Sequence, residues 1–285
     1  MLTEVDRLLV ATPDSERAAT AWGSILGAEE VLRERATSLA AVRRVIRVGR
    51  SDIEFLEPDG AGPVAEALSR RGRAHVFAAG ASASDPDAVA KTAKAAGAKV
   101  EADGARHLVT LQIEGAPIRF VISPEEERAP AGRLDFLYEA TVLAADQAGA
   151  VAKIRDAFGL DETVFTTITS EMFGYTGVLT LFRAGQLHRF EVITPIERDK
   201  TMGRYHAREG ACFYMGFAEA PDLIDIEKRI APGGLTIDRP EGRRDDQSPD
   251  QIWIHPPTLG GVMLGVSRPT MAWMWSGHPE RVAAL

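Results

Sequence analysis

The sequence predicts an α+β protein built from two halves that open alike. The first half opens with an apolar run, Leu8–Ala11, followed by a helical stretch, and the second opens in the same way with Ala140–Leu143. Two pairs of helix-boundary residues are each separated by 132 positions: Asp14 and Asp146 at the starts, Gly27 and Gly159 at the ends. A shared spacing of this kind indicates an internal repeat.

Each opening helix is followed by two β-type runs with a glycine turn between them. Residues 42–48 turn at Gly49 into 52–56, and residues 178–182 turn near Gly185 into 188–193. The same order recurs after each pair. In the first half, the run 75–78 precedes a predicted helix at 87–96 and two more strands at 107–113 and 117–122. In the second half, the run 211–215 precedes a predicted helix at 221–230 and two more strands at 251–254 and 262–266.

The chain therefore reads as four copies of a strand–helix–three-strand module, although the second strand of each copy is weakly signalled. The alternative is a generic α+β protein whose halves resemble each other by chance. The polar stretch Ser123–Arg133, with two prolines and clustered charges, indicates a linker. We expect domains at 1–123 and 134–285 joined by a linker at 124–133, and a soluble fragment after truncation near Ala131.

Composition excludes several classes of protein. The 285 residues carry 33 Lys and Arg against 41 Asp and Glu, a formal charge of −8, and no Lys/Arg-rich run, which argues against a nucleic-acid surface. No apolar run approaches the ~18 residues of a membrane span, and the N-terminus lacks a basic signal region. The single cysteine, Cys212, can form neither an internal disulfide nor a zinc cluster. We expect a cytoplasmic protein.

A chain of such modules resembles the vicinal oxygen chelate superfamily, which includes glyoxalase I, methylmalonyl-CoA epimerase, bleomycin resistance proteins and extradiol dioxygenases. The resemblance covers almost the whole chain. Its most specific local match is residues 254–264, Ile-His-Pro-Pro-Thr-Leu-Gly-Gly-Val-Met-Leu, which is similar to the epimerase-type stretch before the last ligand strand. Residues 53–58, Ile-Glu-Phe-Leu-Glu-Pro, also look like the end of an epimerase-type first module.

The resemblance implies that modules pair into two cupped mixed β-sheets with helices on the outer faces, each cup usually holding a divalent metal. The family places metal ligands in the first and last strands of the paired modules. These positions correspond to Arg7, Glu54, His75 and Arg119 in the first half, and to Glu139, Glu191, Phe213 and Gly265 in the second. The usual set is His, Gln or Glu, His and Glu, so this sequence departs strongly from it.

Strand alternation supports this alignment. Successive side chains of a strand point to opposite faces. Leu8 and Val10 form one apolar face beside Arg7, and Ile53 with Phe55 does the same beside Glu54. Arg119 likewise lies between Ile118 and Phe120. We therefore expect the polar residue of each strand to face the cup, with an open solvated sheet as the alternative.

In the first half, arginine cannot ligate a metal, and two guanidinium groups would repel one. We instead expect Arg7 and Arg119 to lie close together and clamp a carboxylate or phosphate. Glu54 and His75 would then transfer protons. The alternative is a buried ion network that only holds the sheet together.

In the second half, Glu139 and Glu191 are expected to face each other across the cup. They would act as an acid–base pair, or hold Mg²⁺ or Ca²⁺ weakly with water. Phe213 is assigned to substrate binding, because with Gly265 it stands where ligands would be. No tightly bound metal and no other cofactor are expected, since extradiol iron chemistry needs two histidines and a carboxylate.

Other features are given structural roles. His188 is expected to point away from Glu191, His206 to lie in a loop, and His255 to be part of a turn. The aromatic tail Met271–Trp275 is expected to dock on its own domain or to close a pocket. The polar loop 232–250 is expected to cover a cavity or simply to be solvated.

The resemblance and these residues together imply a lyase, isomerase or epimerase acting on a small carboxylated metabolite. Two alternatives remain open: a non-catalytic binding or resistance-type protein, and an extradiol-type dioxygenase, which the missing ligands disfavour. The expected partner is a small anionic metabolite, with a homodimer considered and neither nucleic acid nor membrane expected.

Overall fold

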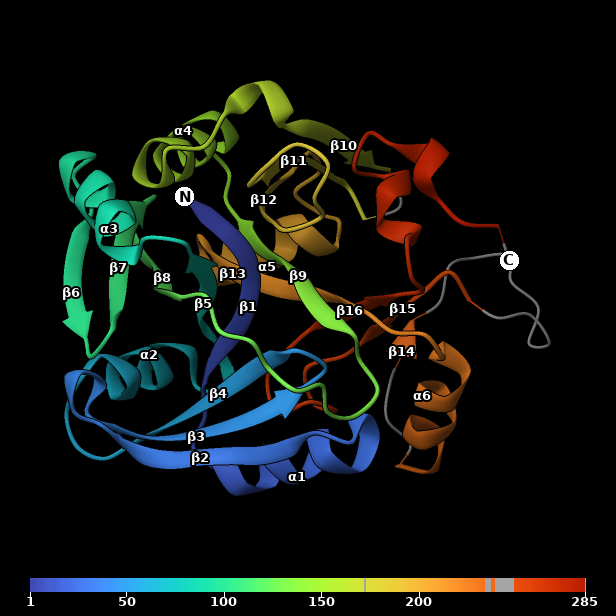
Figure 1. Ribbon diagram of the computed structural model, residues 1–285, viewed down its shortest axis with the longest axis horizontal. Coiled ribbons are helices and arrows are strands. Elements are labelled where there is room, and N and C mark those ends of the chain that lie inside the picture. The colour runs from blue at the N-terminus through green and yellow to red at the C-terminus, as the bar shows by residue number, and fades with distance from the viewer. Residues whose placement is uncertain (172, 234–236, 239–248, 285) are drawn as a thin grey trace.

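The computed structural model describes residues 1–171, 173–233, 237–238 and 249–284. These residues form two curled mixed sheets with helices packed against them (Figure 1). The α+β class and the paired, cupped sheets predicted from the sequence are confirmed. The polar loop 232–250 lies mostly outside the described residues. No helix in the described part of the chain is long and apolar enough to cross a membrane.

The first sheet is built entirely from the first half of the chain, in the strand order β2-β3-β4-β1-β5-β8-β7-β6. Its strands are β1 (Leu2–Ala11), β2 (Glu29–Ala36), β3 (Ala41–Val48), β4 (Ser51–Pro58), β5 (His75–Ala83), β6 (Lys99–Asp103), β7 (Arg106–Ile113) and β8 (Ala116–Pro124). The parallel pairs are β1 with β4 and β5 with β8, so each module closes its last strand onto its first.

The second sheet repeats this order as β10-β11-β12-β9-β13-β16-β15-β14. Its strands are β9 (Phe136–Leu143), β10 (Thr166–Ser170), β11 (Tyr175–Leu181), β12 (Arg189–Pro195), β13 (Cys212–Glu219), β14 (Ile237–Asp238), β15 (Gln251–Ile254) and β16 (Leu264–Ser267). The weakly signalled second strands, such as β2, lie at the sheet edges, and all of β2 except Ala36 is exposed. An exposed edge strand needs no apolar pattern, which explains the weak signal.

The helices predicted in the four modules are present. They are α1 (Ser15–Leu26), α3 (Pro86–Ala95), α4 (Gln147–Phe158) and α6 (Leu223–Ile230). The repeated boundary residues are helix caps: the Asp14 and Asp146 carboxylates accept backbone N–H bonds, and Gly27 and Gly159 adopt the left-handed conformation (φ +71° and +61°).

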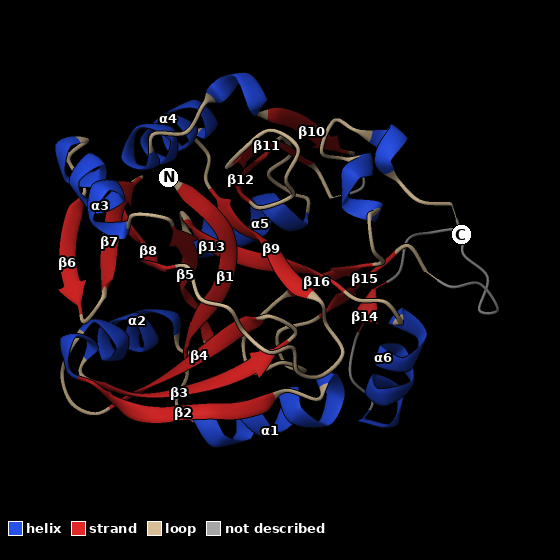
Figure 2. Ribbon diagram, viewed as in Figure 1, coloured by secondary structure: helices blue, strands red, loops and turns tan. Residues whose placement is uncertain are grey.

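Two further helices, α2 (Pro63–Arg71) and α5 (Thr201–Glu209), join the modules of each half. Figures 1 and 2 show α2 lying inside the curve of the first sheet, where Val64 and Ala67 pack on Leu9 and Leu56. The helices are therefore not confined to the outer faces. His206 lies in α5, so the expectation that it lies in a loop is wrong.

The opposite faces of the two sheets share one apolar core. Leu8, Val10, Ile53, Phe55, Ile118 and Phe120 all belong to it, as strand alternation predicts. Phe120 of the first half packs on Phe190 of the second, with ring centroids 4.7 Å apart. β1 and β9 lie side by side where the sheets meet (Figure 1).

The segment predicted as a linker is tied to the first half. The Arg128 side chain is buried, with Nη2 3.0 Å from the Asp6 carboxylate and Nε 3.0 Å from that of Asp52. Gly49 and Ala131 form a β-bridge. The segment 124–133 therefore packs on the first half, and the two halves are joined by a common core.

Candidate functional site

The inner face of the first sheet carries a buried ion network centred on Glu54. Arg7 Nη1 lies 3.1 Å and Arg106 Nη1 2.6 Å from Glu54 Oε1, and Arg43 Nη1 lies 3.5 Å from Oε2. Burial raises the pKa of Glu54, although the charges of Arg7 and Arg43 oppose that effect. Each Glu54 oxygen already has an arginine donor, so this carboxylate has little capacity left for a ligand.

Arg7 is also fully used within the network. Its guanidinium donates to both Asp6 oxygens and to Ser123 Oγ (2.8 Å) as well as to Glu54. A register shift in β1 between Val5 and Arg7 lets the adjacent side chains of Asp6 and Arg7 meet. Burial alone would lower the pKa of Arg7, but the Asp6 carboxylate raises it. Arg7 is a structural cation here, as the ion-network alternative predicts.

Arg119 and His75 take no part in this network. The Arg119 guanidinium lies over the Phe77 ring, 4.5 Å from its centroid. The His75 ring bonds through Nδ1 to the carbonyl of Arg73. Both residues instead line a smaller cavity of about 290 Å³ between the halves, together with Phe213. The structure therefore assembles neither the Arg7–Arg119 clamp nor the Glu54–His75 pair.

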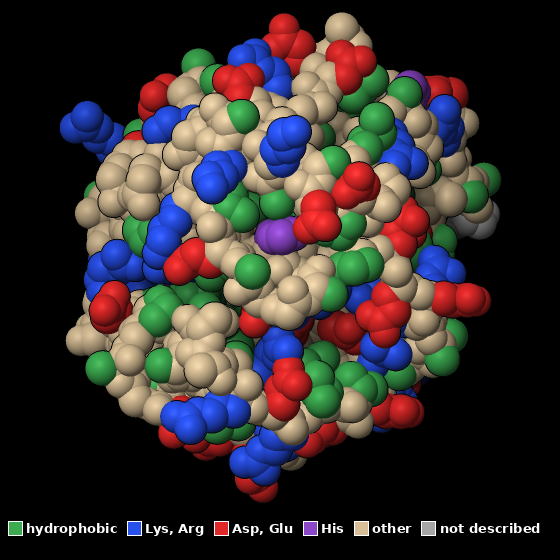
Figure 3. All heavy atoms as spheres, turned by 60° about the vertical axis from the view of Figure 1, so that its left-hand side comes forward, with side chains coloured by type: hydrophobic (Ala, Val, Ile, Leu, Met, Phe, Trp, Pro, Cys, Tyr) green, Lys and Arg blue, Asp and Glu red, His purple; other side chains and the backbone are tan. Residues whose placement is uncertain are grey.

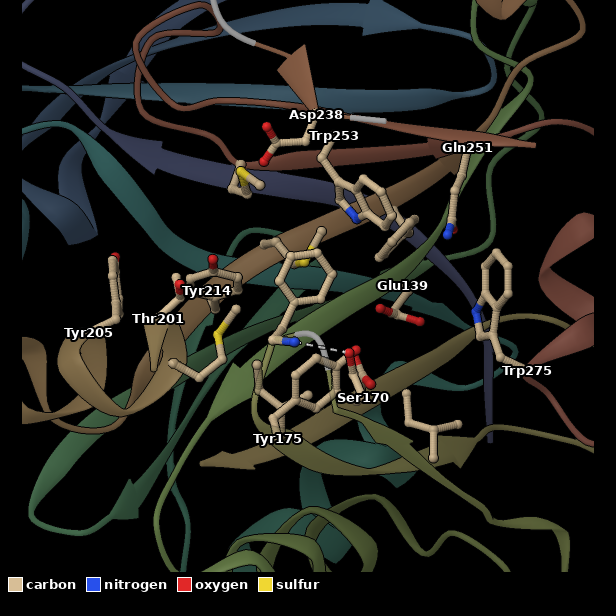
Figure 4. Close-up of a pocket in the computed structure, with 18 of the residues that line it drawn as sticks. Glu139, Ser170, Tyr175, Thr201, Tyr205, Tyr214, Asp238, Gln251, Trp253 and Trp275 are labelled. Carbon is tan, nitrogen blue, oxygen red and sulfur yellow. Dashed lines mark hydrogen bonds between the residues drawn. The ribbon is translucent and has the colours of Figure 1, made fainter. Parts of the chain in front are cut away.

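The second sheet encloses the larger cavity, of about 660 Å³, on its inner face. Figure 4 shows the Glu139 carboxylate among the lining side chains of this cavity, near those of Tyr175, Gln251 and Trp275. α5 contributes Met202 and Tyr205 to the wall, while β14 and β15 contribute Asp238 and Trp253. Aromatic side chains form much of the lining: Phe173, Tyr175, Tyr205, Tyr214, Phe217, Trp253 and Trp275.

Glu139 is held as a carboxylate by a buried arginine. Arg189 Nε donates to Glu139 Oε2 at 2.7 Å, and its Nη1 donates to the Leu187 carbonyl and to Ser276 Oγ. Arg189 is wholly buried, and Glu139 is only 1% exposed. A charge-assisted bond of this length is shorter and stronger than a bond between neutral groups.

Thr141 connects Glu139 to Glu191. Thr141 Oγ1 lies 2.9 Å from Glu139 Oε1 and 3.0 Å from Glu191 Oε2. A hydroxyl has one proton, so it can donate to only one of them and must accept from the other. With Glu139 ionised, the consistent arrangement has Glu191 protonated, donating to Thr141, which donates to Glu139. We call these three side chains the carboxyl relay.

The surroundings of Glu191 favour its protonated form. Burial and then the negative charge of Glu139 raise its pKa well above the ordinary carboxyl range. Glu191 Oε1 and Arg189 Nη2 are both buried without a hydrogen-bond partner among the described residues. Such unpaired polar atoms in a native fold call for a functional explanation. Glu139 and Glu191 are close neighbours in adjacent strands, rather than facing each other across the cup.

The donor set does not fit the divalent metal that the fold family implies. Catalytic metal sites generally supply three protein ligands, and the described residues contain no group of three His, Cys, Asp or Glu side chains able to hold a metal ion. In the fourth module, Phe217 pairs with Glu139 in register, and a Cβ at Gly265 would lie 2.1 Å from the Phe217 ring. An aromatic ring thus fills the space that further ligands need.

The other predicted residues are placed as follows. The Phe213 ring packs on Phe120 in the shared core and does not line the larger cavity. His188 is buried away from Glu191, where its Nδ1 accepts from Val5 N, and burial lowers its pKa to about 4. His255 lies at a turn but also lines the larger cavity, bonded to Asp238 at 2.9 Å.

The aromatic tail does both things that were considered for it. Trp275 lines the larger cavity and contacts Phe217, with ring centroids 6.2 Å apart. Ser276 binds Arg189, so the tail is also docked on its own half. The Trp275 side chain therefore forms part of the cavity wall that also contains Glu139 and Glu191.

Two members of the site escaped sequence reasoning. Thr141 follows Glu139 by two residues, and Arg189 precedes Glu191 by two, so strand alternation places each pair on one face. Strand alternation could therefore have predicted that Thr141 and Arg189 lie on the same face as the two glutamates. The aromatic lining had no local signal, because its members come from separate strands, one helix and the tail.

On the face shown in Figure 3, Lys and Arg side chains are interspersed with Asp and Glu, and no continuous basic patch is visible.

Comparison with known proteins identifies the fold. No protein-family model matches the sequence, and no curated protein matches it. A triple mutant of 4-hydroxymandelate synthase from Streptomyces coelicolor is similar over 99% of this chain and 100% of its own, with a TM-score of 0.74 and 14% identity.

Two other solved structures show the same likeness. The halotolerant catechol dioxygenase BphC matches 94% of this chain and 87% of its own (TM-score 0.64, 12% identity). A Mn(II)-bound glyoxalase from Novosphingobium aromaticivorans matches 94% and 82% (TM-score 0.61, 12% identity). The chain therefore has the vicinal oxygen chelate fold, with the four strand–helix–three-strand modules that its sequence indicates.

Proposed function

We propose that the larger cavity is an active site in which the carboxyl relay moves a proton on a small organic molecule, as in isomerases and lyases. The observation that carries this proposal is the geometry of the two carboxyl groups: one hydroxyl, Thr141 Oγ1, bonds to both Glu139 and Glu191, and Arg189 donates to Glu139 alone. Burial and the charge of Glu139 raise the pKa of Glu191, and two carboxyl groups in such different surroundings are suited to the roles of base and acid. The aromatic lining of the cavity beside them would help a bound substrate to displace water from the reacting groups.

The relay supports a balanced proton shift that needs no second reactant. Glu139 takes a proton from one position of the substrate, and Glu191 gives its proton to another position. The proton on Glu139 then passes to Thr141 Oγ1 as the Thr141 hydroxyl proton passes to Glu191, which restores the starting state. Arg189 holds Glu139 in place throughout and favours the return of Glu139 to the carboxylate form at the end of the cycle. The net result is an isomerisation by tautomeric shift.

The lining of the larger cavity alters the substrate class expected from the sequence. It carries Glu139, Glu191 and Asp238 but neither Lys nor Arg among the described residues, because Arg189 lies behind Glu139. A carboxylated substrate would meet an acidic surface without a counter-charge. Tyr and Trp rings with acidic groups instead favour a neutral or cationic molecule with an apolar or aromatic body.

The test measures exchange and binding separately. Small neutral and amine-bearing aromatic compounds with an acidic C–H would be screened by NMR for deuterium uptake from D₂O, and binding would be followed by the fluorescence of Trp253 and Trp275. For a compound that exchanges, Glu191→Gln and Glu139→Gln should slow exchange by about 10²–10⁴-fold. The exposed Glu29→Gln variant is the matched control.

The second candidate is a binding protein without catalysis, favoured by the same aromatic cavity. If compounds bind with wild-type affinity but none exchanges faster than in buffer, binding alone is the function. If exchange is found and both glutamine variants retain it, the relay is not the catalytic apparatus.

A further inference from the structure

We propose that the smaller cavity, between the two halves, is a second binding site, which holds the carboxylate or phosphate group of a small metabolite. This cavity, of about 290 Å³, lies between the end of α2, the start of β5, β8 and the segment that joins α5 to β13. Its size is near the lower limit of ligand pockets, ~300 Å³. It is separate from the carboxyl relay, so the inference does not depend on the proposed function.

Arg119 is the centre of the argument. Its side chain is partly buried and lines the cavity, and its guanidinium carbon lies 4.5 Å from the centroid of Phe77. Among the described residues no carboxylate lies within ion-pair distance of its guanidinium group, and Glu66 and Glu101 act on it only as more distant charges. Burial, and then the nearby Arg70, lower the pKa of Arg119, and the charges of Glu66 and Glu101 oppose this effect only in part. A buried charge is costly unless it is paired.

The other cations at this cavity are not balanced either. Arg70 also lines it, is exposed, and has no ion pair among the described residues. Arg71 lies 3.4 Å from Glu209, but the same carboxylate also binds Arg73 and Arg208. Glu114 is occupied by His206 and by two backbone N–H groups. The lining therefore has an excess of positive charge.

The position of the arginines at the end of a helix does not explain this excess. Arg70 and Arg71 lie in the last turn of α2, where cations interact favourably with the helix dipole. Arg119 comes from a strand of the other module and gains nothing from that dipole. Guanidinium groups converging from two elements on a concave surface are the usual arrangement for binding carboxylate or phosphate.

His75 provides a probe inside the cavity. Burial, and then Arg71 and Arg70, lower its pKa to about 4, so the ring is neutral at physiological pH. The titratable and charged groups around it are Arg70, Arg71, Arg73, Glu114, Arg119, Glu209 and Cys212, with His206 bonded to Glu114. A bound anion would offset the arginines and raise the pKa of His75.

The experiment titrates His75 by NMR from pH 4 to pH 7.5, with and without inorganic phosphate or citrate, in the full chain. We expect either anion to raise the His75 midpoint by about one pH unit or more. Because both halves line the cavity, the anion should also raise the Tm. Phosphate as the better probe would indicate a phosphorylated metabolite, and citrate a carboxylated one.

Variants decide which groups bind the anion. Arg119→Met keeps an apolar body against Phe77 and should weaken binding about tenfold or more, the effect of losing one charge-assisted hydrogen bond. Arg70→Met, on an exposed position, should weaken binding without risk to the fold. Arg33→Met, on the exposed strand β2, is the matched control and should bind like wild type. An unchanged His75 midpoint, or equal affinity in all three variants, would overturn the proposal.

Discussion

Glu139 and Glu191 have the same side chain but opposite surroundings. Arg189 donates directly to Glu139, whereas Glu191 bonds to the Thr141 hydroxyl, feels the charge of Arg189 at a greater distance, and lies beside the negative charge of Glu139. Proximity of like groups alone would leave the proton shared. The position of one guanidinium decides which carboxyl keeps it.

The raised pKa of Glu191 makes stability depend on pH. The unfolded chain loses this proton near the ordinary carboxyl pKa, ~4.3, while the folded chain retains it to higher pH. Folding therefore takes up a proton in that window, and the stabilisation present at low pH is lost as pH rises toward the raised pKa. Urea unfolding should show wild type losing stability relative to Glu191→Gln between about pH 4 and pH 8. A constant difference between the two proteins would mean that Glu191 is ionised in the fold.

Removing the buried Arg189 side chain should lower the free energy of unfolding, because it leaves Glu139 without its ion-pair partner. Arg189→Met leaves Glu139 charged and unpaired, and breaking a buried pair costs about 3–5 kcal/mol. Adding Glu139→Gln to Arg189→Met should recover much of this loss, because no buried charge then remains. Chemical denaturation of both variants measures the effect, and equal stability of the single and double variants would refute the pairing.

Residue-level prediction from sequence succeeded where alternation alone was enough. It placed Glu139 and Glu191 on the inner face, but it chose Phe213 where the structure places Phe217 beside Glu139. β13 has register shifts on both sides of Met215–Phe217, and an irregularity of this kind leaves no mark in the pattern. Alternation correctly predicted that Arg119 lies on the inner face of the first sheet. It does not show how far apart two residues on that face lie, so the separation of Arg119 from the Arg7 network could not be predicted.

At the scale of elements, the two opening helices use the same caps in different surroundings. A Cβ on Gly27 would lie 2.6 Å from Arg133 Nη1 and 3.1 Å from Gly132, whereas one on Gly159 would meet only Thr92, at 3.8 Å. Both glycines have positive φ, and both caps lie at equivalent places in their modules.

These caps therefore give a matched pair of substitutions. Gly159→Ala should cost about 1–2 kcal/mol, the penalty of a left-handed non-glycine residue. Gly27→Ala should cost more, since its methyl group also displaces the segment 132–133. Thermal unfolding of the two variants would test this order, and equal losses would show that the contact with Gly132 is unimportant.

The helices α2 and α5 were missed by sequence reading. Both are short, and their exposed faces are rich in arginine, with only Val64 and Ala67 of α2 and Met202 and Gly203 of α5 buried. Two buried positions are too few to define a helical period. These helices nevertheless matter most for function, because each lies over the inner face of its sheet and shapes a cavity.

The whole molecule is held together by a core that belongs to both halves. Trp22 of α1 is completely buried, and its indole N–H donates to the carbonyl of Leu259, in the second half. Phe120, Phe158, Phe190 and Phe213 form an aromatic cluster across the boundary. The sequence showed two repeats but could not show that their outer faces pack on each other.

This core reverses the expectation of an independent first half. The fragment 1–131 would expose Trp22 and Phe120 and should aggregate or unfold without cooperativity. Co-expression with 132–285 should restore a soluble complex, because the second half covers the same surface. Size-exclusion chromatography and thermal unfolding measure both outcomes. A soluble fragment that unfolds cooperatively would show that the shared core is dispensable.

The protonation state of Glu191 is the central claim, and infrared spectroscopy measures it directly. In protein labelled with ¹³C-glutamate, the account predicts a protonated carboxyl band at pH 7 that disappears in Glu191→Gln and persists in Glu29→Gln. Thr141→Val should shift this band, since its hydrogen-bond partner is removed. Absence of the band in wild type would mean that both relay carboxyls are ionised, and would contradict the account.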